Sequence, residues 1–108
     1  MLSNSFKQMF LGAAPAAKTV EYTVPTDAVS AVIKDLTAYN SSTSAVTFKM
    51  YINDVMFVNT SIAAGDTIFG DREWTMVLNP GDKVAVEAST ADVIQVIVSG
   101  AVVTNATV

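Results

Sequence analysis

Apolar and polar residues alternate with a period of two along most of the chain, which is the pattern of β-strands that bury one face. In the segment 46–52, every second residue is large and apolar, and the residues between them are Thr, Lys and Tyr. Asn53 and Asp54 follow this segment and predict a two-residue hairpin turn into a return strand that ends near Ile62.

Glycine turns divide the second half of the chain. Gly65 in "AAGD" and Gly81 in "NPGD" occupy the turn position that tolerates positive φ. The two turns bracket a strand that ends near Leu78, and further strands are predicted over 84–88 and 93–103.

A first strand is predicted from Thr19 to Pro25, and the second, from Val29 onward, contains an irregularity. Val29, Ala31 and Ile33 keep one phase, but the next apolar residue is Leu36. A β-bulge near Lys34–Asp35 would restore the phase.

Together these patterns predict an all-β fold. Strands are short, turns recur about every ten residues, and no helical pattern follows Thr19. We expect an antiparallel β-sandwich of jelly-roll type with about seven or eight strands over residues 18–108, preceded by an N-terminal arm over residues 1–17.

The arm is the first candidate assembly segment. Phe6, Met9, Phe10 and Leu11 are apolar, and Pro15 separates them from the first predicted strand. As a short helix or an extended tail, the arm could dock on a neighbouring copy or on a capsid or tail protein, so its deletion should impair assembly more than folding. The alternative is that the arm closes its own sandwich and covers the outer face of the last strand.

The last strand is apolar on both faces. Ile94, Val96 and Val98 can face the core, yet the opposite side carries further apolar residues. Such a strand is usually covered on both faces, either by a loop over a central strand or by another subunit. The subunit hypothesis adds three predicted assembly contacts: Ile97, Ala101 and Val103.

Composition narrows the set of partners. Hydrophobic residues make up 51% of the 108 residues and charged residues 15%, against an ordinary charged share of about 25%. The net charge of -4 lacks the basic footprint that phosphate neutralisation requires, so direct nucleic-acid binding is not expected. The most apolar window, 93–103, is too short for a membrane-spanning helix. The absence of cysteine fits synthesis in a cytoplasm.

Candidate catalytic chemistry is sparse. The chain has no His and no Cys, which excludes His-dependent triads, Cys nucleophiles and His-ligated zinc. Asp66, Asp71, Glu73 and Asp82 could form a carboxylate pair or a calcium site, but Asp after a turn Gly normally bonds the local backbone. We therefore expect a non-enzymatic protein with no catalytic residue, metal or cofactor.

The order of the segments resembles small virion structural proteins of tailed bacteriophages. The resemblance runs from Leu2 to Val103, through "LSNSFKQMFLG", "EYTVP", "AVIKDLTAYNSSTSAVTFKMYIND", "AAGDT", "NPGDKVAVEAST" and "VIVSGAVV". It implies an oligomeric β-sandwich in the virion, made in the host cytoplasm, that decorates or joins parts of the capsid or tail. Its partners would be copies of itself and other virion proteins.

A second function class remains open at this stage. A small carbohydrate-binding β-sandwich could use Trp74 and Tyr51 as stacking residues. An exposed Trp74 with polar neighbours would favour sugar binding, and a buried Trp74 would favour assembly.

Overall fold

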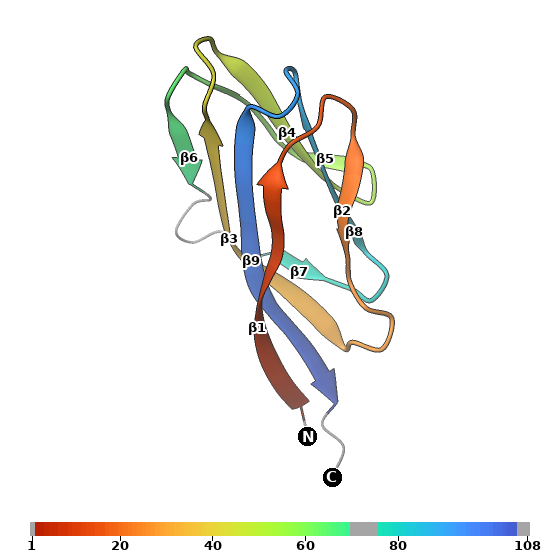
Figure 1. Cartoon of the computed structure of the whole chain (residues 1–108). Helices are drawn as coiled ribbons and strands as arrows, with labels where there is room; N and C mark the ends of the chain where they lie inside the picture. Colours follow the sequence, from red (N-terminus) through yellow and green to blue (C-terminus); the bar gives the residue numbers. More distant parts are fainter. Residues whose placement is uncertain (1, 70–75, 106–108) are drawn as a thin grey trace.

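The computed structural model describes residues 2–69 and 76–105, which form nine β-strands (Figure 1). The strands are β1 (Leu2–Ala13), β2 (Thr19–Thr23), β3 (Ser30–Asn40), β4 (Val46–Ile52), β5 (Val55–Ile62), β6 (Thr67–Phe69), β7 (Met76–Leu78), β8 (Lys83–Ala88) and β9 (Ile94–Asn105). The molecule is elongated, with extents of 53 × 24 × 19 Å.

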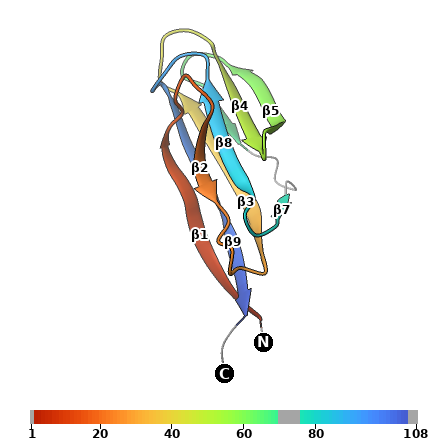
Figure 2. The same ribbon diagram turned by 90° about the vertical axis from the view of Figure 1, so that its right-hand side faces the viewer.

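The strands form two antiparallel sheets. Sheet A has the order β1-β9-β3-β6, with β7 also paired to β3, and sheet B has the order β2-β8-β4-β5. Figures 1 and 2 show β1 and β9 side by side, with the start of β1 and the end of β9 at the same end of the molecule. The chain changes sheet between β1 and β2, β2 and β3, β3 and β4, β5 and β6, β7 and β8, and β8 and β9, whereas β4 and β5 form a hairpin within sheet B.

The pairing confirms the predicted jelly roll. Strands pair from the two chain ends inward: β1 with β9, β2 with β8, β3 with β6 and β7, and β4 with β5. This long ribbon wraps so that β9 also pairs β3 and β8 also pairs β4, which gives the two-sheet jelly-roll arrangement. Because β6 and β7 share one strand position, nine strands fill the eight positions of the fold.

The core lies between the sheets and is built from the predicted alternation. Strand β4 buries every second residue along its whole length. The largest fully buried side chains come from both sheets, and they include Phe48 and Met50 of sheet B and Ile33, Leu36 and Ile94 of sheet A. Since these side chains interdigitate, the two sheets are held together by burial of apolar surface.

The predicted β-bulge is present in β3. Its register against β9 shifts between Ile33 and Asp35, so that Ile33 and Leu36 both point into the core. Gly100 of β9 lies opposite Ile33, and a Cβ there would come within 1.8 Å of the Val32 carbonyl oxygen. The close approach of the two backbones at the bulge therefore requires glycine.

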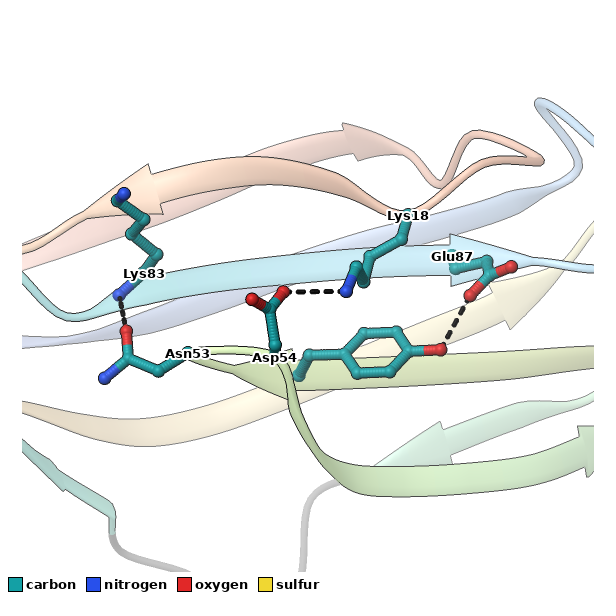
Figure 3. Close-up of polar contacts among 6 residues, drawn as sticks. Lys18, Asn53, Asp54, Lys83 and Glu87 are labelled. Carbon is teal, nitrogen blue, oxygen red and sulfur yellow. Dashed lines mark hydrogen bonds and ion pairs between the residues drawn. The ribbon is translucent and has the colours of Figure 1, made fainter.

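The predicted turns are confirmed by their backbone angles. Asn53 and Asp54 have φ of 50° and 67°, as a hairpin turn that needs two left-handed residues demands. Gly65 and Gly81 have φ of 74° and 85°. The Asn53 side chain also accepts a hydrogen bond from the Lys83 backbone N–H, which ties the hairpin to β8 (Figure 3).

Asn40 is a buried polar residue that organises the loop after β3. Its Nδ2 donates to the carbonyl oxygens of Ser44 and Ile62, each at 2.8 Å. Its Oδ1 accepts from the backbone N–H and the hydroxyl of Ser42. Because both the Nδ2 and the Oδ1 of Asn40 are hydrogen-bonded, these bonds compensate the cost of removing the amide from water.

The predicted N-terminal arm is corrected by the structure. Residues 2–13 form neither a helix nor a free tail, because β1 pairs with β9 from Leu2 opposite Asn105 to Ala13 opposite Gln95. The segment after it is also bonded, since the Ala14 N–H donates to the Ile94 carbonyl oxygen. The first residues of the chain are therefore an edge strand of sheet A. They add to the edge of β9, so this segment completes its own sandwich, as the alternative hypothesis held, but it does not cover the outer face of β9.

Candidate assembly surface

The outer face of sheet A, the face turned away from sheet B, carries a first apolar row across four strands. The register places Phe6 of β1 beside Ala101 of β9, Ala101 beside Val32 of β3, and Val32 beside Val77 of β7. Phe6 is 84% exposed and Val77 is 69% exposed, while the small Ala101 between its neighbours is only 6% exposed. The row therefore has large apolar side chains open to solvent at both ends.

A second row lies four residues away along β9. Leu11 of β1 pairs with Ile97, and Ile97 pairs with Thr37 of β3. Leu11 is 65% exposed and Ile97 is half-buried. Val103 extends the same face of β9 beyond the first row and is also half-buried.

Between the two rows the face is polar and recessed. Gln8, Ser99 and Asp35 form the middle row in the register of β1, β9 and β3. A shallow hollow of about 410 Å³ opens here, lined by Phe6, Lys7, Gln8, Lys34, Ser99 and Gly100. Small residues at its floor, Ser99 and Gly100, are what leave the space open.

Five of the seven predicted contact residues share this face. The register places five of them at outward positions: Phe6, Leu11, Ile97, Ala101 and Val103. We use the name sheet A outer face for these residues together with the three rows described above. Tertiary pairing brings β1 and β9 from opposite ends of the chain to form it.

The other two predicted contacts belong to the core, which corrects their assignment. Met9 sits at a second bulge, where the register of β1 shifts between Gln8 and Phe10, and it is 7% exposed. Phe10 is partly buried and packs against the same core. The bulge turns the following residues by one position, so Phe10 points inward while Leu11 points outward.

Val32 and Val77 were not predicted as contacts. Each lies in a short apolar stretch whose pattern alone does not say which face is solvated. The signal that could have found them is the bulge: once Ile33 and Leu36 are both placed in the core, Val32 must face outward.

Sheet B also exposes large apolar side chains, with Val55 and Phe57 of β5 each 56% exposed, but it carries a group of paired polar side chains as well. Lys18 Nζ lies 2.7 Å from Asp54 Oδ1 (Figure 3), and this contact holds the pKa of Asp54 below its usual range. The Tyr51 hydroxyl donates to Glu87 Oε1 at 2.7 Å, which raises the pKa of the phenol. These polar groups thus form their ion pair and hydrogen bond with one another, within the same domain.

The same contacts bear on the carbohydrate hypothesis. Lys18 Nζ lies 5.0 Å from the centroid of the Tyr51 ring, in cation–π range. A sugar stacking on that side of the ring would have to displace the ammonium group. Trp74, the other predicted stacking residue, lies outside the described residues, as do Asp71 and Glu73.

Within residues 2–69 and 76–105, no three acidic, His or Cys side chains come close enough to hold a metal ion. Asp82 instead accepts hydrogen bonds from the Asn79 backbone and the Asn53 side chain, which lower its pKa. The same ranges contain no helix long and apolar enough to cross a membrane.

Five chains of solved structures are similar to this chain, and they include the following two. A chain from Bacillus endospore appendages, described as disulfide-linked pili, matches 94% of this chain and 85% of its own length, with 12% identity and a TM-score of 0.49. A chain of infectious bursal disease virus, Gt strain, matches 94% of this chain and 32% of its own length, with 8% identity and a TM-score of 0.32. No protein-family model and no curated protein sequence matches the chain. Identities this low and TM-scores below 0.5 leave its function undetermined by similarity.

Proposed function

We propose that this chain is a non-enzymatic structural protein of a bacteriophage virion, which decorates or joins parts of the capsid or tail. The observation that carries the proposal is the sheet A outer face, where Phe6, Leu11 and Val77 are each more than three-fifths exposed. Large apolar side chains gathered on one face mark a surface that other molecules cover. The resemblance of the sequence to phage virion proteins is the reason for proposing that this assembly is a virion.

The two apolar rows support an assembly role for this face, because neither row holds a charged residue. Interface centres are depleted of charge and hold aromatic and aliphatic side chains. Copies of this chain and other virion proteins are the proposed partners, and the virion is the proposed location.

Particle association tests the proposal. A lysate of cells that produce this chain together with virus particles is separated on a density gradient, and the chain is followed with an antibody. We expect the natural chain in the particle fractions and the Phe6→Ser/Leu11→Ser double variant at the top of the gradient.

A matched double variant controls for loss of apolar surface in general. Val20 and Met56 lie on sheet B and are about half exposed. The Val20→Ser/Met56→Ser variant should stay with the particles. Natural chain found only at the top of the gradient, in a lysate rich in particles, would contradict the proposed function.

A further inference from the structure

We infer that the free edge of β1, the side not paired with β9, pairs antiparallel with the same edge of a second copy of this chain. The twofold axis passes between the two β1 strands at Gln8 and stands perpendicular to sheet A, so the two copies of sheet A join edge to edge. This pairing rests on the proposed assembly function and names one partner and one contact within that assembly.

Strand β1 is the longest open edge among the described strands. It ends sheet A and has 12 residues, whereas the other edge strands have five (β2), eight (β5) and three each (β6 and β7). Residues 3–8 are exposed without interruption, on both faces of the strand. Long edges without proline and with few charges readily accept another strand. Residues 2–13 contain no proline and one charged residue, Lys7.

Hydrogen bonds show which residues of β9 are bonded to β1. In an antiparallel pair, both backbone groups of a residue point to the same neighbouring strand, and the direction alternates along the chain. The Ile94 carbonyl oxygen accepts from the Ala14 N–H, just after β1, and the Val103 carbonyl oxygen accepts from the Val29 N–H, just before β3. Even-numbered residues of β9 therefore point to β1, and odd-numbered residues point to β3.

Residues of β1 that lie opposite the odd-numbered residues of β9 must direct their backbone groups to the free edge. They include three residues of the sheet A outer face: Phe6, Gln8 and Leu11. All three side chains are exposed. A strand added at this edge would thus bond the backbone of the same residues whose side chains are open to solvent.

Two copies of this edge match when Gln8 lies opposite Gln8. Because the bulge gives Met9 and Phe10 together one position, Phe6 and Leu11 are each two positions from Gln8. The twofold axis therefore sets Phe6 of each copy opposite Leu11 of the other. These are the exposed ends of the two apolar rows on β1, at 84% and 65% exposure, so each row continues into the other row of the second copy.

Neighbouring registers are less favourable. An axis at Lys7 would set two ammonium groups directly opposite each other, which destabilises an antiparallel pair. An axis at Phe6 would require residues 2 and 3 in the pair, and chain ends are the segments that fray. The axis at Gln8 sets each Lys7 opposite the apolar position of Met9 and Phe10, and the pairing runs from Asn4 to Ala13.

A cysteine at the axis tests the register directly. The natural chain has no Cys, so the full-length Gln8→Cys variant carries one thiol. Residues opposite each other in a hydrogen-bonded antiparallel pair have Cα atoms about 5.5 Å apart, a separation that a disulfide can bridge. Mild oxidation at micromolar concentration should convert most of this variant to a disulfide-linked dimer, seen on a non-reducing gel.

The matched control is Asn4→Cys, which is exposed on the same strand and the same edge. Its copy across the axis lies opposite Ala13, eight positions along the strand, or about 27 Å away at about 3.4 Å per residue. This variant should remain monomeric in the same reaction. Equal dimer yields from the two variants, or no dimer from Gln8→Cys, would overturn the inference.

Charge at the axis provides an independent test by sedimentation velocity. Gln8→Lys and Gln8→Glu should each raise the dimer dissociation constant at least tenfold, because like charges then meet at the axis. An equimolar mixture of the two variants pairs opposite charges and should dimerise to within about threefold of the natural chain. A mixture as weak as either variant alone would show that the pairing is wrong.

Failure of the edge pairing can be told apart from failure of the proposed function. A purified chain that is monomeric at all concentrations, yet still sediments with particles, overturns the twofold dimer and leaves the assembly function standing. A chain that forms the dimer but never joins particles supports the edge pairing and contradicts the virion role.

Discussion

At the scale of single residues, Gly100 is the position with the least room for a side chain. A Cβ there would lie 1.8 Å from the Val32 carbonyl oxygen and 3.0 Å from the Ile33 Cα. Since backbone atoms of a central strand cannot rotate away, we expect Gly100→Ala to lower the free energy of unfolding by about 1–3 kcal/mol or more. Urea denaturation measures this change.

Gly12→Ala is the matched control for Gly100→Ala. Its Cβ would approach two atoms of the Phe10 ring at 3.2 and 3.3 Å, and a side chain can shift by a few tenths of an ångström. Its midpoint should therefore stay near that of the natural chain. Equal midpoints for the two variants would show that β3 and β9 are not so close at the bulge.

Asn40 is the second residue-scale case, because it is a buried amide with four side-chain hydrogen bonds. Asn40→Ala would leave the Ile62 carbonyl oxygen without this donor in the interior. We expect a loss of about 1–3 kcal/mol of stability, which thermal unfolding followed by circular dichroism would detect. Thr43→Ala, which removes an exposed hydroxyl from the same loop, should change stability by less than about 0.5 kcal/mol. A harmless Asn40→Ala would show that the loop does not depend on this side chain.

At the scale of elements, β1 serves two purposes with adjacent residues. Met9 is buried in the core, whereas Phe6 is open to solvent. Met9→Ala should therefore cost about 2 kcal/mol or more of stability, while Phe6→Ala should leave stability within about 0.5 kcal/mol and weaken association. Thermal unfolding and sedimentation of the same two variants separate the effects.

The same element changes the expected effect of truncation. The arm hypothesis predicts that a chain without its first residues keeps its fold, but β1 pairs with β9 along its whole length. Removal of residues 1–13 would expose the edge of a central strand and part of the core. We expect loss of cooperative unfolding, and a truncated chain with an unchanged melting curve would restore the arm hypothesis.

At the scale of the whole molecule, the jelly roll brings the two chain ends together. Leu2 pairs with Asn105, and Figure 1 shows the start of β1 and the end of β9 at the same end of the molecule. A circular permutant that joins the ends through a short Gly-Ser linker and opens between Ala63 and Ala64, an exposed turn, should keep the β-sheet spectrum and cooperative unfolding. A permutant opened between Ile97 and Val98 of β9 should not fold. The pairing of the ends would be refuted if the first permutant were unfolded.

Much of this molecule was determined by local sequence. Period-two alternation places 46–52 with one face inward, and the hairpin turn at Asn53–Asp54 and the glycine turns follow from backbone preferences that depend on one or two residues. Even the β3 bulge can be predicted from the sequence, because Ile33 and Leu36 cannot lie on the same face of a strand without it. Each of these features is set by neighbours in the chain, so the sequence determined it.

The position of residues 2–13 was decided by the tertiary structure alone. Ser3, Asn4 and Ser5 give this segment no clean alternation, and the bulge at Met9 reverses its phase, so local pattern indicates an arm rather than a strand. Its partner, β9, is about ninety residues away in sequence, and whether Met9 fills the core or Phe6 faces solvent depends on that pairing. The sequence by itself thus determined that the chain is a jelly roll with an apolar last strand. Only the meeting of its two ends decided which apolar residues of the segment 2–13 join the outer face and which fill the core.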